Sequence, residues 1–184
     1  MVVSRAKDTM SSPSFNQFLA TLRTQLRIKA NWLANESVVL DDNLRTYGLI
    51  IELTTTEIRQ LQVAAYIKNM GAIYLGNEAL SQEMPSAVLQ SAIKTWQLLS
   101  LEIAVASGME SVTTIIEQYA MRQIPENRLA SIFQVVNVWV SCLMPKGYRP
   151  PMTPHDAKTT LLQRVELGWS DRAVVDHFLS TLNR

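Results

Sequence analysis

The chain has 184 residues, of which 47% are apolar and 18% are charged, and its formal net charge is +1. This length suits one domain with a hydrophobic core, and the high apolar content argues against intrinsic disorder. A dedicated nucleic-acid binder would carry a larger basic excess. The single cysteine excludes a disulfide scaffold, and two histidines leave little material for a histidine-rich metal centre. We expect a cytoplasmic protein that does not span a membrane, because the most apolar stretch, 135–144, is half the roughly 20 residues required.

The first half of the chain predicts helices after a flexible leader at residues 1–13. Apolar residues at helical spacing predict a helix from Ser14 to about Ala34. Asp41 or Asp42 can cap a second helix, which should bury the side of the helix that bears Leu44. Together these segments predict two amphipathic helices before residue 54.

The middle of the chain carries clearer boundary signals. Thr54 and Glu57 form a capping box, and the helix that they open should end at Gly71 in the left-handed conformation. An irregular piece over 74–84 follows. Pro85 suits the first turn of a long helix that reaches about residue 106 and stops at Gly108.

The last third predicts helices at about 110–122, 127–143, 154–167 and 171–182. Thr153 is a good cap for the third of these, Gly168 should end it, and Ser170 can cap the last one. Because no alternating strand pattern of convincing length occurs, we predict an all-α fold of about eight or nine helices. Residues 14–184 should form a single domain.

The sequence contains no self-sufficient active site. It lacks a glycine-rich phosphate loop, a serine elbow and an HExxH zinc pattern. The adjacent pairs His155-Asp156 and Asp176-His177 are interpreted as solvated surface pairs, not as ligands or a catalytic dyad. Cys142 lies in an apolar helix without a basic neighbour and is interpreted as an inert core thiol. The basic bias of residues 1–30 is more typical of a solvated face than of a contact with an acidic partner.

Residues 64–80, AAYIKNMGAIYLGNEAL, resemble the best-known segment of the HD-GYP phosphodiesterases, a branch of the HD metal-dependent phosphohydrolases. The family pattern there is A-A-x-x-H-D-x-G-K-x-x-x-P-x-x-x-L. The matching positions are Ala64, Ala65, Gly71 and Leu80. The His-Asp pair of the pattern falls on Lys68 and Asn69, and its lysine falls on Ala72.

Two later segments resemble the same family. Residues 136–149, VNVWVSCLMPKGYR, are similar to its A-D-x-x-D-A-L-x-x-x-R-x-Y-R pattern, with Tyr148 and Arg149 retained. The ending GWSDRAVVDHFLSTL is similar to G-x-F-D-P-x-L-V-x-x-F-L-x-x-L. The resemblance covers about residues 40–182 and implies an HD-domain-like helical bundle.

The departures from the family concern its metal ligands. In HD-GYP proteins, histidines and aspartates from several helices hold metal ions that activate water against a phosphodiester. Here the ligand positions fall on residues of other kinds: Lys68, Asn69, Trp96, Tyr119, Asn137 and Val140. The loop that bears Gly-Tyr-Pro is missing, since only Arg122 and Gln123 precede Ile124-Pro125. A lysine ammonium repels a dication, and an amide replaces a carboxylate poorly. The resemblance therefore implies a domain without metal, cofactor or catalysis, in which Lys68 pairs with a buried acceptor or with a ligand phosphate.

Three functions remain open at this point. The first is a non-catalytic domain that acts in bacterial signalling through protein–protein interaction, linked to cyclic di-GMP or two-component pathways and potentially homodimeric. The second is a sensor that binds cyclic di-GMP without cleaving it, with Lys68, Lys146 and Arg149 as phosphate contacts. The third is a phosphohydrolase with a displaced metal site, for which the two His/Asp pairs are the best candidates.

Overall fold

The computed structural model of the chain describes residues 13–76, 80 and 86–182, and all of its regular elements are helices. Within these residues the elements are α1 (Pro13–Lys29), α2 (Asn31–Ile50), α3 (Thr55–Met70), the short 3₁₀ helix η1 (Gly71–Tyr74), α4 (Ser86–Ala106), α5 (Glu110–Tyr119), α6 (Arg128–Leu143), α7 (Pro154–Glu166) and α8 (Arg172–Thr181). The all-α prediction is confirmed. Residues 1–12 of the expected leader, Pro85 and most of the irregular piece at 74–84 lie outside the described residues.

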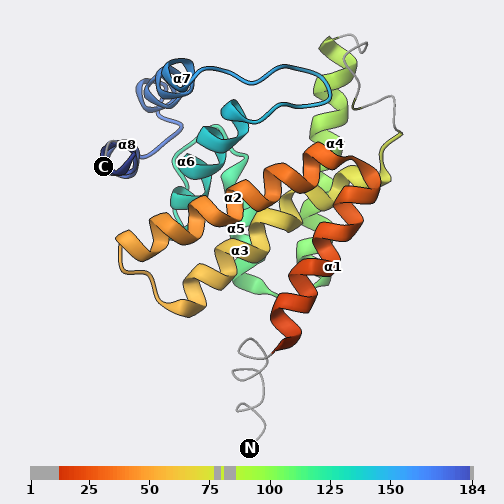
Figure 1. Ribbon diagram of the computed structural model, residues 1–184. Helices are drawn as coiled ribbons and strands as arrows, with labels where there is room; N and C mark the ends of the chain where they lie inside the picture. Colours follow the sequence, from red (N-terminus) through yellow and green to blue (C-terminus); the bar gives the residue numbers. More distant parts are fainter. Residues whose placement is uncertain (1–12, 77–79, 81–85, 183–184) are drawn as a thin grey trace, which may run out of the picture.

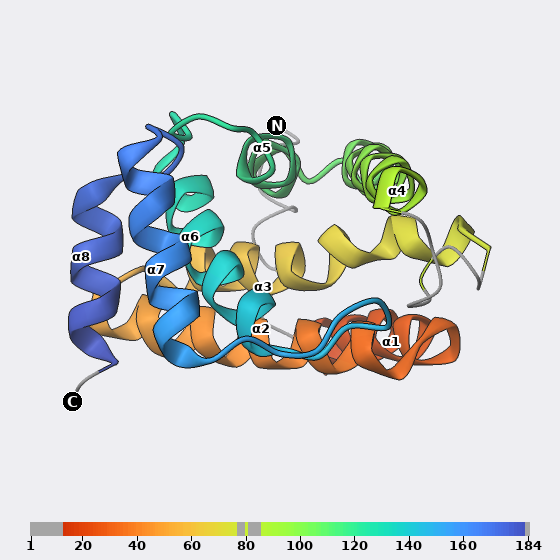
Figure 2. The ribbon, with the colours of Figure 1, turned by 90° about the horizontal axis from the view of Figure 1, so that it is seen from above.

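Helix α3 lies at the centre of the molecule. It packs against α1 and α2 on one side and against α4 and α5 on the other, so these five helices form three layers, and α6, α7 and α8 lie at one end of them (Figures 1 and 2). Its last eight residues, from Val63 to Met70, are all buried. A helix that is enclosed on every side places its polar residues inside the protein as well as its apolar ones. Lys68 and Asn69 are two such polar residues.

The expected boundary between the first two helices was wrong. The chain turns at Ala30, whose backbone is extended, and α2 then runs without a break through Asp41 and Asp42. The cause is tertiary, because the turn lets α1 fold back against α2 and α3. Neither a glycine nor a proline marks the turn.

The cap predictions at Thr54 and Thr153 are confirmed. The Thr54 hydroxyl accepts a hydrogen bond from the Glu57 amide, and the Glu57 carboxylate accepts one from the Thr54 amide. The Thr153 hydroxyl accepts one from the Asp156 amide. These bonds satisfy amides that the first helical turn leaves without backbone partners.

Gly71 follows α3 as predicted, but its conformation was predicted wrongly. Its φ of −60° is right-handed, and the chain continues directly into η1. Glycine is required here because the backbone of α4 lies very close to Gly71. An added Cβ would lie 2.1 Å from the carbonyl oxygen of Trp96. The absence of a side chain here allows α4 to pack closely against the end of α3.

At the C-terminal end, the predicted cap of α8 was also wrong. Asp171, not Ser170, caps the helix by accepting from the Val174 amide. Ser170 is buried, and its hydroxyl donates to the side chain of Gln134. Gly108 and Gly168 have the positive φ values of 68° and 70° that suit the ends of α4 and α7.

The buried apolar residues of the described chain other than Cys142 and Ala157 form one continuous cluster, to which all eight α-helices contribute. None of these helices combines the length and the apolar character that a membrane span requires.

Candidate functional site

A small pocket of about 100 Å³ lies where five helices and the loop after α6 meet. It is lined by Glu36, Lys68, Ile93, Trp96, Gln97, Tyr119, Asn137, Ser141, Lys146 and Tyr148. Of the residues that the sequence analysis singled out, Lys68, Trp96, Tyr119, Asn137 and Lys146 line it. Candidate residues from separate segments of the chain therefore line the same pocket.

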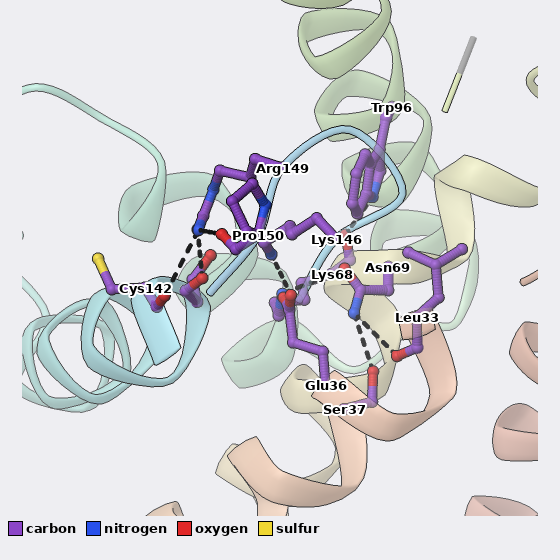
Figure 3. A network of polar contacts seen from close by, with 11 residues as sticks. Leu33, Glu36, Ser37, Lys68, Asn69, Trp96, Cys142, Lys146, Arg149 and Pro150 are labelled. Carbon is purple, nitrogen blue, oxygen red and sulfur yellow. Dashed lines mark hydrogen bonds and ion pairs between the residues drawn. The ribbon is translucent and has the colours of Figure 1, made fainter. Parts of the chain in front are cut away.

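A buried triad of charges forms one wall of the pocket. Glu36 of α2 is 0% exposed, and its two carboxylate oxygens pair with the ammonium groups of Lys68 and Lys146 (Figure 3). Lys68 comes from α3 and Lys146 from the loop after α6. The hypothesis that Lys68 pairs with a buried acceptor is thereby confirmed, and the acceptor is Glu36. We refer to Glu36, Lys68 and Lys146 as the buried triad.

Charge interactions inside the triad are strong because little water reaches it. Burial opposes ionisation of Glu36, but the two ammonium groups outweigh this effect and lower its pKa to about 2. Burial and, to a smaller extent, the nearby Lys68 charge lower the pKa of Lys146, and against the attraction of Glu36 the net pKa is about 8. Two cations share one carboxylate, so the fully ionised triad carries a net charge of +1.

Aromatic rings enclose the Lys146 end of the triad. The Lys146 ammonium lies 5.6 Å from the centre of the Trp32 ring, a distance that allows a cation–π interaction. The same Trp32 ring meets Trp96 and Tyr148 edge to face, with centroids 6.0 and 5.8 Å apart. Burial raises the pKa of Tyr148 to about 12, with the Glu36 charge as a further cause, so its hydroxyl stays neutral. The rings exclude water from the ammonium group.

Trp96 and Ser100 of α4 are fixed by the backbone of α3. The Trp96 indole donates to the carbonyl oxygen of Lys68 at 2.7 Å, and the Ser100 hydroxyl donates to the same oxygen at 2.9 Å. The Ser100 oxygen in turn accepts from the Gly71 amide at 2.9 Å. These bonds replace the helical partners that the end of α3 lacks and hold α4 in place.

Asn69 and Val140 do not line the pocket. The Asn69 amide donates to the Ser37 hydroxyl at 2.9 Å, and its oxygen accepts from the Lys68 ammonium at 3.1 Å (Figure 3). Asn69 therefore hydrogen-bonds to the triad without lining the pocket. Val140 is a core residue that is 2% exposed.

Arg149 is held away from the pocket. It donates to the carbonyl oxygens of Ser141, Cys142 and Pro150, two of which belong to the last turn of α6 (Figure 3). A guanidinium at this position satisfies free carbonyl groups and complements the helix dipole. Its role in the described structure is to hold the loop after α6 against that helix.

The loop is held in a tight turn, because Lys146 and Arg149 exchange two backbone hydrogen bonds. Gly147 within this turn passes so close to the backbone that an added Cβ would lie 2.2 Å from the carbonyl oxygen of Leu80. The turn thus presents Lys146 to Glu36 with little freedom to move.

The remaining candidates lie elsewhere. His155 and Asp156 are exposed in the first turn of α7. His177 is exposed as well, and its Nδ1 lies 3.1 Å from the Tyr47 hydroxyl. Cys142 is buried as expected, and burial raises the pKa of its thiol. The expectation that no basic neighbour acts on the thiol was wrong, since the Arg149 charge lowers its pKa, although burial outweighs this effect.

The residues around the pocket do not fit the metal ions that HD-GYP proteins hold. The carboxylate that lines it, Glu36, is engaged by two ammonium groups. The Asn137 amide oxygen is buried without a hydrogen-bond partner, and it alone would be a weak ligand. Across residues 13–76, 80 and 86–182, no group of three or more His, Cys, Asp or Glu side chains could hold a metal ion.

The sequence analysis missed Glu36, the residue on which the triad depends. A signal for it was present, because Glu36 lies between Leu33 and Leu40 on the buried side of α2. An acidic residue at i+3 and i−4 from buried leucines would have to bury its charge, and a buried charge requires partners.

Comparison of the chain with protein-family models, curated proteins and solved structures finds no match. Function is therefore inferred from the geometry of the site and from the resemblance of three sequence segments.

Proposed function

We propose that this chain is a non-catalytic, HD-GYP-like helical domain that acts in bacterial signalling by binding another protein. The observation that carries the proposal is the buried triad. It stands among the positions where the resemblance places a metal centre, and its three charged groups are engaged with one another.

The triad supports the absence of hydrolysis for an electrostatic reason. A metal-dependent phosphohydrolase needs carboxylate and imidazole ligands that are free to bind cations. Here two ammonium groups hold the carboxylate and would repel an incoming dication. Displacing them would leave buried lysines without a counter-charge, which is strongly unfavourable.

The geometry favours this proposal over cyclic di-GMP sensing. A pocket of about 100 Å³ is well below the roughly 300 Å³ at which sites for drug-sized ligands begin. All three predicted phosphate contacts also have partners within the protein. Lys68 and Lys146 bind Glu36, and Arg149 binds backbone carbonyl groups.

The test begins with protein purified without chelator. Elemental mass spectrometry should find less than about a tenth of an equivalent of Fe, Mn, Zn or Ni, because the described residues offer no group of three or more His, Cys, Asp or Glu ligands. With added Mn²⁺ or Fe²⁺, cleavage of cyclic di-GMP and of a chromogenic phosphodiester should equal that of the Asn137→Ala variant and of buffer. Calorimetry should detect no heat of binding for cyclic di-GMP.

The predicted protein–protein interaction is tested by cross-linking the tagged domain in its native cells. Mass spectrometry of the cross-linked material should identify a second signalling protein. One or two equivalents of metal that survive gel filtration, with turnover that Asn137→Ala abolishes, would overturn the proposal and favour an enzyme. Cyclic di-GMP binding that is lost in Lys146→Met would favour the sensor instead.

A further inference from the structure

Helix α4 carries an apolar strip that the described residues do not cover. It is 21 residues long and lies at the edge of the molecule, on the opposite side of α3 from α1 (Figure 2). Its inner side contributes Trp96, Ser100 and Ala104 to the interior. On its outer side, Leu98 is 64% exposed and Val105 is 60% exposed. A contiguous exposed apolar patch with polar residues at its rim marks a contact surface, whereas single exposed apolar residues do not.

The charges of α4 are arranged symmetrically about Leu98. The helix has two charged residues, Lys94 and Glu102, which lie four positions before and four positions after Leu98. Both are exposed, and residues at i±4 form one continuous ridge on a helix surface. Neither side chain forms an ion pair or a hydrogen bond with the described part of the chain.

We propose that this strip binds α4 of a second copy of the chain, antiparallel, with the two-fold axis beside Leu98. A two-fold contact is self-complementary, so residue 98−n meets residue 98+n of the other copy. Leu98 then meets its own copy, Lys94 lies beside Glu102 of the second copy, and the same pair recurs across the axis. Packing the two i±4 ridges side by side is the commonest arrangement of helices in globular proteins.

The charge pattern favours a second copy as the partner. In an antiparallel two-fold contact about Leu98, Lys94 and Glu102 lie at equal distances from the axis, so their opposite charges pair twice in each dimer. The strip is short, so we expect a reversible dimer whose population rises with concentration. This inference does not depend on the proposed function, because neither catalysis nor a signalling partner enters it.

Charge reversal provides the test, with sedimentation velocity across a concentration series as the readout. Lys94→Glu and Glu102→Lys should each weaken dimerisation by at least about tenfold, because like charges then oppose each other twice in every dimer. The double variant should restore the wild-type dissociation constant, because it exchanges the two signs. Unchanged thermal unfolding at low concentration would show that each variant folds.

Disulfide trapping tests the register independently. Leu98→Cys should form a covalent dimer under mild oxidation, since the two copies of this position meet at the axis. Ser91→Cys is the matched control, because it is exposed on the same helix but would lie about 21 Å along the helix from its own copy. The native Cys142 is buried.

A chain that stays monomeric at every concentration overturns the proposal, whether residues outside the described ranges or another protein cover α4. A dimer that neither charge reversal weakens, or one that Ser91→Cys traps as readily as Leu98→Cys, overturns it as well.

Discussion

The buried triad and the outer side of α4 contain the same kinds of charged residue and use them in opposite ways. In the triad, Glu36 is 0% exposed and both of its oxygens are paired within the chain. On α4, Lys94 and Glu102 are exposed, and neither forms an ion pair within the described residues. Charges that satisfy each other inside a protein close a site to ligands, whereas unpaired charges beside apolar residues leave a surface open to a partner.

The largest expected effect is the loss of the central carboxylate. Glu36→Gln should reduce the free energy of unfolding by about 3–5 kcal/mol at pH 7, because two ammonium groups remain buried without a counter-charge. The matched change on the surface, Glu102→Gln, should alter it by less than about 0.5 kcal/mol in protein kept monomeric by dilution. Chemical denaturation monitored by circular dichroism measures both. Equal losses of unfolding free energy in Glu36→Gln and Glu102→Gln would contradict the view that only the charge of Glu36 is needed for stability.

The pH dependence of the same pair of proteins sharpens the comparison. The pKa of Glu36 is about 2 in the folded chain, below its ordinary value of 4.5. Its ionised form therefore stabilises the fold fully above about pH 4.5 and progressively less as the pH falls toward 2. The stability difference between wild type and Glu36→Gln should shrink over that range. A difference that stays constant down to the acid unfolding transition would contradict the assignment.

A smaller effect is expected for one of the two cations. Lys146→Met should change the free energy of unfolding by less than about 2 kcal/mol in either direction, because Glu36 keeps Lys68 as its partner. The pKa of Lys146 is about 8 in the folded chain against an ordinary 10.5, so its charge is disfavoured by folding. Wild-type stability should therefore rise relative to the variant between about pH 8 and 10.5. Lys94→Met is the surface control, for which denaturation curves should show no such rise.

The fold was largely predictable from the sequence because its boundary signals are local. The capping box at Thr54 and the threonine cap at Thr153, together with Gly108 and Gly168, mark helix ends through hydrogen bonds and backbone preferences within a few residues. The turn at Ala30 carries no such signal. It exists because α1 folds back against α2 and α3, and single-residue preferences do not report such a requirement.

The site was predictable only in part. The resemblance located Lys68, Trp96, Tyr119 and Asn137 at one pocket, although these residues are spread along the chain. Glu36 lies outside the resembling segments, and its importance comes from contacts 32 and 110 positions away in the sequence. Arg149 matched the family pattern, yet its guanidinium donates its hydrogen bonds to backbone carbonyl groups. The type and position of a residue do not reveal which partners the fold provides.

The central claim is that Glu36 is held ionised by Lys68 and Lys146, so the pocket is closed to metal ions and phosphates. The most direct test is an NMR titration of the Glu36 side-chain carboxyl carbon in uniformly labelled protein, assigned with Glu36→Gln. We predict that this carbon keeps the chemical shift of a carboxylate through the range around the ordinary pKa of 4.5 and begins to titrate only as the pH approaches 2, for as long as the protein stays folded. A titration near the ordinary value of 4.5 would show that the lysines do not hold the carboxylate and would contradict the account.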